Sequence, residues 1–291
     1  MDTQLLQAFA AVAEHGSFST AAEHMHLTQP AVSKRIALLE NQLSCNLFDR
    51  VGRQITLTEA GRALLPHAQS VLQEIRAAKR HIQDLRGGVT GLLSMGISHH
   101  MGLHRLPPVL KRFTQQYPEV RLDIDFLDSE EAYERVLLGE VELGVITLAP
   151  EEKLSLQQTP IWQDELVVTV ARNHPLAAQS RVSARALSQY RAILPGLNTY
   201  TGRIIKTLFE QQQLPLDVSM STNYLETIKV MVSIGFGWSV LPKTLLDDNL
   251  CGLTLSGQKL TRELGVVAHR ERSLSNAASA FLQLLLAERK R

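Results

Sequence analysis

Shortages of cysteine and of long apolar runs each exclude a class of protein. The 291 residues include only two cysteines, Cys45 and Cys251, which excludes a disulfide framework and is typical of a reducing compartment. No apolar run is long enough to cross a bilayer, and the first residues lack the basic segment and cleavage site of a secretory signal. We therefore expect a cytoplasmic protein that has no membrane partner.

The chain also has almost no net charge. Lysine and arginine number 30 and aspartate and glutamate 29, so the net charge of +1 does not by itself indicate a nucleic-acid partner. Hydrophobic residues make up 44% and charged residues 20%, which is the composition of an ordinary globular protein. The chain is long enough for at least two folded domains. Any case for DNA binding must therefore rest on local patterns.

Two short helices are expected before residue 27. Apolar residues at helical spacing indicate the first of them, namely Leu5, Phe9, Val12 and Ala13. Gly16 follows this run, as a glycine just beyond a helix C-terminus commonly does. Thr20 and Glu23 have the spacing of a capping box, which predicts that a second helix begins at Thr20 and closes near His26.

A third helix is predicted over residues 29–43. Thr28 offers an N-cap hydroxyl, and Pro30 falls in the first turn, where a missing N–H breaks no helical hydrogen bond. One stripe of this helix is apolar and must face the core: Val32, Ile36, Leu39 and Leu43. The opposite face and the N-terminal end are small and polar: Gln29, Pro30, Ser33, Lys34, Ala37 and Asn41.

The polar face carries the residue types of a helix that reads DNA. Small side chains allow close approach to the major groove, Gln29 and Ser33 can hydrogen-bond base edges, and Lys34 can bind phosphate or guanine. Such a face is also the common solvent-exposed side of a helix, so the stretch that follows it decides the interpretation.

A β-hairpin wing is predicted after the third helix. Gly52 marks a turn, and polar and apolar residues then alternate over residues 54–58. On such a wing Arg50 and Arg53 can reach a flanking phosphate or a narrow minor groove. Residues 1–58 are therefore predicted to be an all-α winged helix-turn-helix domain whose partner is double-stranded DNA.

The sequence of this head resembles a known family. From Phe18 to Leu65 it reads FSTAAEHMHLTQPAVSKRIALLENQLSCNLFDRVGRQITLTEAGRALL, which resembles the DNA-binding head of a LysR-type transcriptional regulator without a break. Ser44 stands where many members of that family have glycine. The resemblance implies a sequence-specific transcription regulator.

One long linker helix is expected after the wing, over residues 59–88. Thr58 is its N-cap, Pro66 is its only internal proline, and a pair of glycines ends it. Steps of three and four residues align the heptad seam of a coiled coil: Ala68, Val71, Ile75, Ala78, Ile82 and Leu85. An amphipathic helix packed on its own domain would also show apolar positions. The strict seam favours a partner helix, so we expect a homodimer through these residues.

Residues 89–291 change to alternating short strands and helices, which predicts α/β units with parallel sheets. Lobe I, about 91–160 and 266–291, is expected to hold strands 92–97, 121–127, 143–146 and 264–268 and helices 104–117, 129–138 and 276–288. Lobe II, about 161–265, is expected to hold strands 165–171, 192–194, 218–220 and 239–241 and helices 201–212 and 224–234.

Polar residues at the ends of these strands form the candidate effector site. In open α/β sheets, ligands bind outside the carboxyl ends of the strands, where helix N-termini point into a crevice. The candidate residues there are Ser98, His99, His100, Ser129, Thr147, Asn198, Thr199, Tyr200 and Thr201. Their hydroxyls and the helix dipoles suit a small polar or anionic molecule, although each serine or threonine can instead be an N-cap.

This half also resembles the family. The segments LPPVLKRFTQQYPEVRLDIDF, LLGEVELGVI and MVSIGFGWSVLP are similar to the effector domain of LysR-type regulators, a two-lobed fold like that of periplasmic binding proteins. The resemblance implies that an effector binds between the lobes, at Ser98, Ser129 and the 198–201 loop, and that dimers assemble into a homotetramer. His99 and His100 depart from the small residues that are common there.

Other functions remain as alternatives. For an enzyme, Gly235 and Gly237 follow a helix rather than a strand, and no Walker loop or serine elbow is present, so we expect no catalytic residue. A secreted solute receptor would lack the DNA-reading head. For a metal sensor, His99, His100 and His104 offer two imidazoles on one helix face, but the sequence shows no third ligand, so we expect no metal and no cofactor. A redox switch would need a cysteine in a low-pKa motif, and neither is in one.

Overall fold

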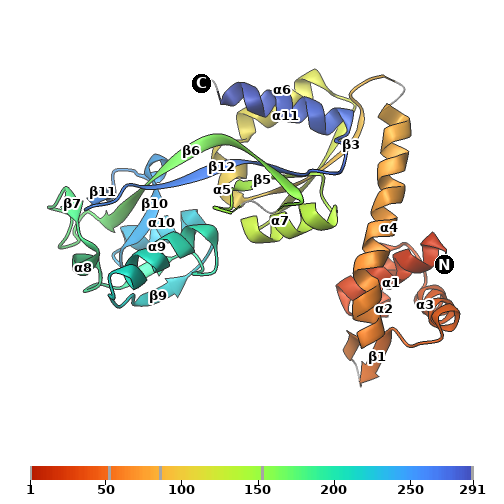
Figure 1. The fold of residues 1–291 in the computed structure, drawn as a ribbon. Coiled ribbons are helices and arrows are strands. Elements are labelled where there is room, and N and C mark those ends of the chain that lie inside the picture. The colour runs from red at the N-terminus through yellow and green to blue at the C-terminus, as the bar shows by residue number, and fades with distance from the viewer. Residues whose placement is uncertain (1, 52–53, 85–86, 152–153, 290–291) are drawn as a thin grey trace. The chain divides into compact units, whose positions relative to one another are not determined.

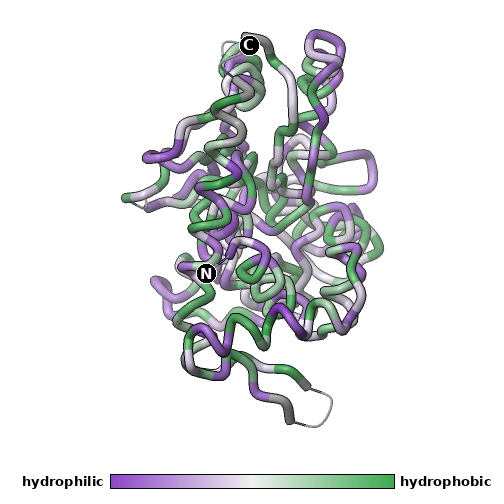
Figure 2. Tube along the Cα trace, turned by 90° about the vertical axis from the view of Figure 1, so that its right-hand side faces the viewer, coloured by the Kyte–Doolittle hydropathy of each residue, from purple (hydrophilic) through white to green (hydrophobic). Residues whose placement is uncertain are grey.

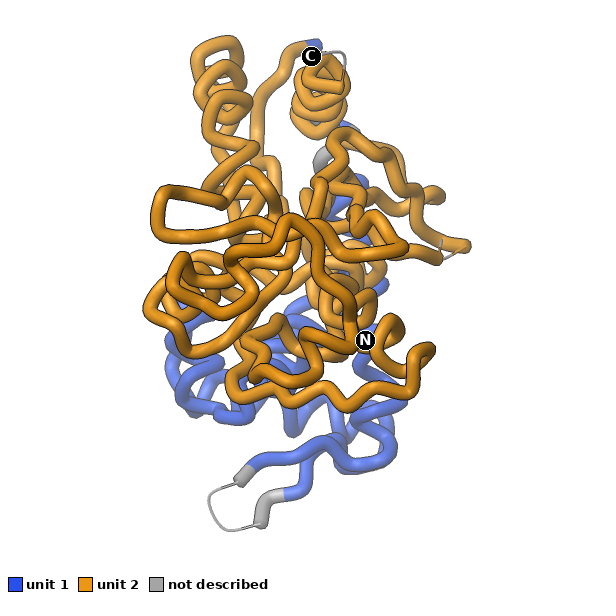
Figure 3. The backbone as a smooth tube through the Cα atoms, turned by 90° about the vertical axis from the view of Figure 1, so that its left-hand side faces the viewer, with its two compact units in different colours: residues 1–87 blue, residues 88–291 orange. Residues whose placement is uncertain are grey.

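The computed structural model describes residues 2–51, 54–84, 87–151 and 154–289. It divides into two compact units, Met1–Gly87 and Gly88–Arg291, which Figure 3 shows in blue and orange. Each unit has its own hydrophobic core. Hydrophobic and hydrophilic segments alternate along the trace in Figure 2. Among the described helices, none has both the length and the apolar character that crossing a membrane requires.

Unit 1 consists of four helices and a small hairpin. Its elements are α1 (Thr3–His15), α2 (Phe18–His24), α3 (Gln29–Leu43), β1 (Phe48–Val51), β2 (Gln54–Leu57) and α4 (Glu59–Asp84) (Figure 1). Phe9, Val12 and Ile36 are fully buried where α1 packs on α3. The predicted order of three helices, hairpin and long helix is confirmed.

The start of α2 differs from the prediction. Ser17 is its N-cap, because the Ser17 hydroxyl accepts a hydrogen bond from the backbone N–H of Thr20 at 3.3 Å. Phe18 is the first helical residue and is buried in the unit 1 core, so packing holds this turn in the helix. The expectation that the helix begins at Thr20 is wrong. Thr28 is the N-cap of α3 by position, but its hydroxyl makes no cap hydrogen bond within the described residues.

Two side chains attach the hairpin of unit 1 to its helices. Glu40 on α3 accepts a hydrogen bond from the backbone N–H of Leu47 at 2.8 Å. Thr58 donates its hydroxyl proton to the carbonyl of Asn46 at 2.7 Å and accepts from the backbone N–H of Gly61 at 3.0 Å. Thr58 thus caps α4 as predicted, and it also ties α4 to the residues before the first strand.

Unit 2 is built on an eight-stranded sheet. Seven of its strands follow the order β4-β3-β5-β12-β6-β11-β7, and the eighth, β10, also pairs with β6. The strands are β3 (Gly91–Ile97), β4 (Val120–Phe126), β5 (Leu143–Thr147), β6 (Leu156–Ala171), β7 (Arg181–Val182), β10 (Ser239–Pro242), β11 (Leu250–Leu255) and β12 (Leu260–His269). A second, two-stranded parallel sheet contains β8 (Ala192–Leu194) and β9 (Val218–Ser221).

Two lobes share the long strands β6 and β12, which run from one lobe into the other (Figure 1). Lobe I contains β3, β4 and β5 with α5 (His99–His104), α6 (Pro107–Gln116), α7 (Ser129–Leu138) and α11 (Asn276–Glu288). Lobe II contains β7 to β11 with α8 (Ala184–Leu187), α9 (Tyr200–Gln211), α10 (Leu225–Ser233) and the short 3-10 helix η1 (Lys243–Leu245).

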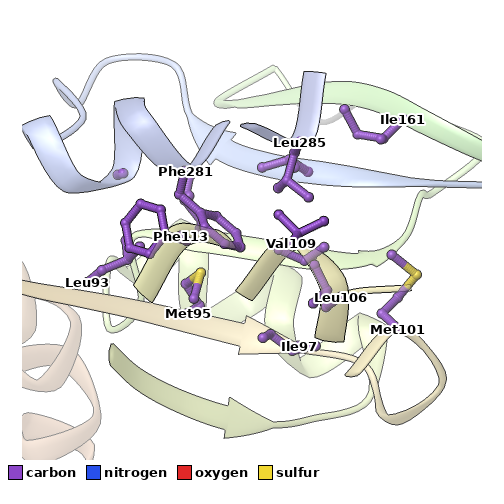
Figure 4. Packing of buried hydrophobic residues seen from close by; sticks show 14 of the residues in the cluster. Leu93, Met95, Ile97, Met101, Leu106, Val109, Phe113, Ile161, Phe281 and Leu285 are labelled. Carbon is purple, nitrogen blue, oxygen red and sulfur yellow. The ribbon is translucent and has the colours of Figure 1, made fainter. Parts of the chain in front are cut away.

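Each lobe has an aromatic centre. In lobe I, Phe113 on α6 meets Phe281 on α11 edge to face at 5.1 Å, above Leu93 and Met95 of β3 (Figure 4). In lobe II, Phe209 on α9 stacks on Trp238 at 5.7 Å. The helix that closes lobe I therefore comes from the end of the chain, as predicted.

Three features of unit 2 differ from the prediction. The expected helix over 104–117 begins only at Pro107, as α6, because the chain reorients at Arg105 and Leu106 and prolines occupy the first turn; the short helix α5 that precedes it was not predicted. The sheets are mixed, since β12 pairs antiparallel with both β5 and β6. The strands β7 and β11 and the helix α8 were not predicted; β7 has only two residues and α8 only four.

Candidate functional site

The predicted reading face lies on the outer side of α3. Gln29, Pro30 and Lys34 are exposed and Ser33 is half-buried. On the opposite side of the helix Val32, Ile36 and Leu39 are completely buried in the unit 1 core. This burial fixes the rotation of α3, so the small polar face is the accessible one.

The hairpin next to α3 has a regular register. Phe48 pairs with Leu57 and Val51 pairs with Gln54, so the two strands are antiparallel up to the turn. The predicted DNA contact Arg53 lies outside the described residues, and only the backbone of Arg50 is described. The roles of both arginines stay predictions.

The predicted dimer seam on α4 divides into two parts. Ala68 is buried in the core of unit 1, so it packs within its own chain. Four later seam residues are accessible: Val71, Ala78 and Ile82 are exposed and Ile75 is half-buried. Leu85 lies outside the described residues. An exposed apolar row on a long helix supports pairing with a second helix, which stays a prediction.

A pocket between the two lobes of unit 2 brings most of the predicted effector residues together. Its volume is about 490 Å³, part of it open to solvent. Lobe I contributes Ser98, His99, His100, Leu127, Asp128, Ser129, Glu130 and Thr147, and lobe II contributes Pro195, Thr199, Tyr200, Thr201, Asn223 and Leu225. Arg262 of β12 completes the lining. Of the nine predicted residues, Asn198 alone is not part of this lining, and it is exposed.

The pocket hydroxyls differ in what they already bind. Ser129 accepts from the backbone N–H of Thr147 at 3.2 Å, and Thr201 accepts from Arg262 at 3.2 Å. Thr199 is the N-cap of α9, with its hydroxyl 3.0 Å from the N–H of Gly202. The buried hydroxyl of Ser98 has no hydrogen-bond partner among the described residues. Ser98 is therefore the hydroxyl most available to a ligand.

A buried charge cluster lies beneath the pocket. Asp164 on β6 faces Arg262 on β12 as a direct cross-strand pair, with Arg262 Nη2 2.9 Å from Asp164 Oδ2. Arg105 binds the other carboxylate oxygen at 2.8 Å, and His100 Nε2 lies 3.3 Å from Oδ2. Burial alone would raise the pKa of Asp164, but His100 and the two arginines hold it well below its usual range. Burial also lowers the pKa of His100, because the charged imidazole would lose its hydration.

Three polar contacts join the lobes around the pocket. Glu130 of α7 accepts from the backbone N–H of Tyr200 at 2.6 Å, at the N-terminus of α9. Asn223 donates to Asp128 at 2.6 Å. His104 of α5 lies 2.6 Å from Glu226 of α10.

Sequence reasoning missed the residues that make these long-range contacts. Asp164 and Arg262 stand just outside the predicted strand cores, and 98 positions separate them in the chain. A charged residue at the edge of an apolar strand was the available signal, but only the register shows that the two are opposite each other. Asp128 and Glu130 lie beside the predicted Ser129 and could have been included.

Comparison with known families places both halves of the chain. Residues 3–62 match the family described as "Bacterial regulatory helix-turn-helix protein, lysR family". Residues 86–290 match the family described as "LysR substrate binding domain". Together the two matches cover the helix-turn-helix head and unit 2 up to residue 290.

Relatives agree with these families. An "Uncharacterized HTH-type transcriptional regulator in ibpB-leuC intergenic region" of Azotobacter vinelandii is 60% identical over 108 residues, 37% of this chain and 75% of its own. A "Probable RuBisCO transcriptional regulator" of a Synechocystis species is 31% identical and is matched over 97% of this chain and 84% of its own. A full-length variant of OxyR from Pseudomonas aeruginosa has the same fold, with a TM-score of 0.71 at 21% identity over 100% of this chain and 95% of its own. The chain therefore belongs to the LysR family of bacterial transcriptional regulators, with a DNA-binding helix-turn-helix and an effector-binding domain.

Proposed function

We propose that the pocket between the lobes binds a small polar effector and that this binding changes how the protein holds its DNA. The observation that supports the proposal most strongly is the buried hydroxyl of Ser98, which has no hydrogen-bond partner among the described residues. It lies in a pocket that is lined by residues of both lobes. A buried hydroxyl without a partner is costly, and a ligand group would satisfy it.

Charges in the pocket bear on the class of effector. Asp164 offsets the charge of only one of the two arginines that it binds, Arg105 and Arg262, and the carboxylate of Glu130 already occupies the N-terminus of α9 through the N–H of Tyr200. A neutral polar effector can bind beside this carboxylate. An anionic effector would bind at the same helix terminus only after displacing Glu130, since helix N-termini attract negative groups.

Closure of the lobes is the proposed signal. The cross-lobe hydrogen bonds of Tyr200 and Asn223 lie at the rim of the pocket, so a ligand that changes their spacing changes the angle between lobes. We expect homodimers through α4 and a homotetramer through unit 2, in which such a change alters the spacing of the DNA-binding heads. Coupling of this kind is reciprocal and typically amounts to about 5- to 150-fold in affinity.

A thermal-shift screen of small organic acids, amino acids and sugars tests the proposal. A ligand at about a hundred times its Kd stabilises the protein by about 2.7 kcal/mol. The effector found in this way should lose its effect in Ser98→Val, which removes the free hydroxyl, and keep it in Thr114→Val, an exposed hydroxyl on α6. A full response to the effector in Ser98→Val would show that the effector does not bind in this pocket.

The reading of DNA is proposed to use the exposed face of α3. Gln29 and Ser33 contact base edges, Lys34 contacts phosphate or guanine, and the wing arginines Arg50 and Arg53 contact the flanking backbone. Pro30 allows close approach at the start of the helix, where it is exposed. Support comes from the orientation of α3, since burial of its apolar stripe leaves this face accessible.

A further inference from the structure

Two histidines and a glutamate meet where lobe I faces lobe II. His100 and His104 lie one turn apart on α5, with ring centroids 4.9 Å apart. Glu226 is in the first turn of α10, and its Oε1 atom lies 2.6 Å from Nε2 of His104. One ligand atom from each of the three residues lies within 4.8 Å of the other two. The sequence offered only the two histidines, because Glu226 is 122 positions away from His104.

These side chains are a suitable donor set for a transition-metal ion. Two imidazoles and a carboxylate bind zinc and its neighbours at about 2.0–2.2 Å, and around a tetrahedral ion the ligand atoms are roughly 3.4 Å apart. The contact between His104 and Glu226 would open to reach that spacing, and the longest separation in the cluster would close. Both changes are within the reach of side-chain rotation.

His100 adds an independent observation. It is only 6% exposed, and neither of its ring nitrogens makes a hydrogen bond within the described part of the chain. Its Nε2 atom lies 3.3 Å from a carboxylate oxygen of Asp164, and Nδ1 has no carboxylate this close among the described residues. Metal-binding histidines are commonly oriented by a carboxylate on the other ring nitrogen. Asp164 has this place for an ion bound at Nδ1, and Arg105 and Arg262 hold the carboxylate.

We propose that His100, His104 and Glu226 bind one divalent ion of the zinc type between the lobes. Three protein ligands leave a fourth position for water. Because two ligands come from α5 in lobe I and one comes from α10 in lobe II, the bound ion links the lobes. His100 also lines the effector pocket, so the ion is adjacent to it.

The test is a titration of the full-length protein with zinc chloride after removal of metals by a chelator. Calorimetry should find about one zinc ion per chain. Cobalt chloride as a second probe should give the visible absorption of a four-coordinate ion. Glu226→Gln, which keeps the size of the side chain and removes its charge, should lower the affinity for zinc at least about tenfold. His104→Gln, at a more exposed position, should do the same.

A matched control separates this site from other histidines. His24 stacks on His15 in unit 1 with ring centroids 4.1 Å apart, so His24→Gln alters a histidine pair away from the cluster. Zinc binding should survive in His24→Gln. The proposal is overturned if zinc binding persists unchanged in both Glu226→Gln and His104→Gln, or if it is lost only in His24→Gln. It is also overturned if the parent protein does not bind zinc. Since the titration contains neither DNA nor effector, either result leaves the proposed sensing function standing.

Discussion

The two units of this protein present their functional side chains in opposite ways. In unit 1 the predicted reading face of α3 is accessible, and the fold acts by burying the opposite face of the helix. In unit 2 the pocket residues already bind one another across the lobes, through Glu130, Asn223 and Arg262. A rigid, exposed face suits a partner that is always the same, such as duplex DNA. A network that a ligand must rearrange suits a switch.

The largest expected effect tests whether the network of unit 2 is also its structural weak point. Arg262→Leu leaves the buried carboxylate of Asp164 with Arg105 as its only arginine partner among the described residues. Breaking a buried ion pair in this way costs about 3–5 kcal/mol of folding stability. Calorimetry should show a lower melting temperature for unit 2 and none of this loss in unit 1. The double variant Asp164→Leu with Arg262→Leu removes both charges and should recover much of the stability. Equal losses in the single and double variants would contradict the buried-pair explanation.

The next prediction tests the exposed face of unit 1. Gln29→Ala should relax sequence preference by about 1–3 kcal/mol, since it removes contacts to a base edge. Lys34→Ala should weaken specific and random DNA alike and reduce the salt slope by about one. Binding curves at several salt concentrations separate the two effects. If both variants bind DNA as the parent does, α3 is not the reading helix.

Dimerisation through α4 would add a second exposed surface to unit 1. Ile75→Asp places a charge in the row that includes the exposed Val71 and Ile82. The dimer should dissociate at least about tenfold more readily, which corresponds to about 1.4 kcal/mol. Sedimentation measures the change, with Glu74→Gln, on an exposed flank of the same helix, as the control. If Ile75→Asp leaves the dimer affinity unchanged, the dimer contacts do not include this row of α4.

A smaller effect concerns the turn after α3. Ser44 is the C-cap of this helix with a φ of 54°, a left-handed conformation that is strained for a residue with a Cβ atom. Ser44→Gly should stabilise unit 1 by up to about 1 kcal/mol in urea unfolding. Ser44→Ala keeps the Cβ atom and should bring no gain, so a gain in alanine equal to that in glycine would rule out strain as the cause.

The smallest effect is a pH dependence confined to unit 2. Burial lowers the pKa of His174 and of His269, and each imidazole accepts a backbone N–H through Nδ1, at 3.1 Å and 3.2 Å. Because both folded-state pKa values lie below the unfolded value, this stability is complete above about pH 6.5 and is lost as the pH falls through the lowered values. The share of these two histidines in the fall of the melting temperature should be less than about 2–4 °C, the change that 1 kcal/mol gives in a unit of this size.

Asparagine is the informative replacement at these two positions. Its side-chain oxygen can accept the same backbone N–H but does not titrate. His174→Asn with His269→Asn should therefore melt with a flatter pH profile between about pH 7.5 and about pH 5.5. An unchanged slope would assign the acid sensitivity of unit 2 to other groups.

Local signals explain which parts could be predicted from the sequence. The apolar stripe of α3, the hairpin and the cap at Thr58 each depend on residues close together in the chain, and all are present in the structure. Eight of nine proposed pocket residues also line one pocket, because strand ends of a parallel sheet lie together. The pairing of Asp164 with Arg262 and the approach of Glu226 to His104 depend on strand register and lobe packing. No local pattern contains that information.

The return of the chain to lobe I sets the order in which the molecule can be completed during synthesis. Unit 1 lies within the first 87 residues, so it can fold as soon as it leaves the ribosome. Lobe I must wait for β12 and α11, whose Phe281 covers Phe113, although its first strand begins at Gly91. A chain that terminates before Asn276 would thus keep α3 but lack α11, the helix that covers the core of lobe I. Such a fragment would retain the core of unit 1 and lose the cover of the lobe I core.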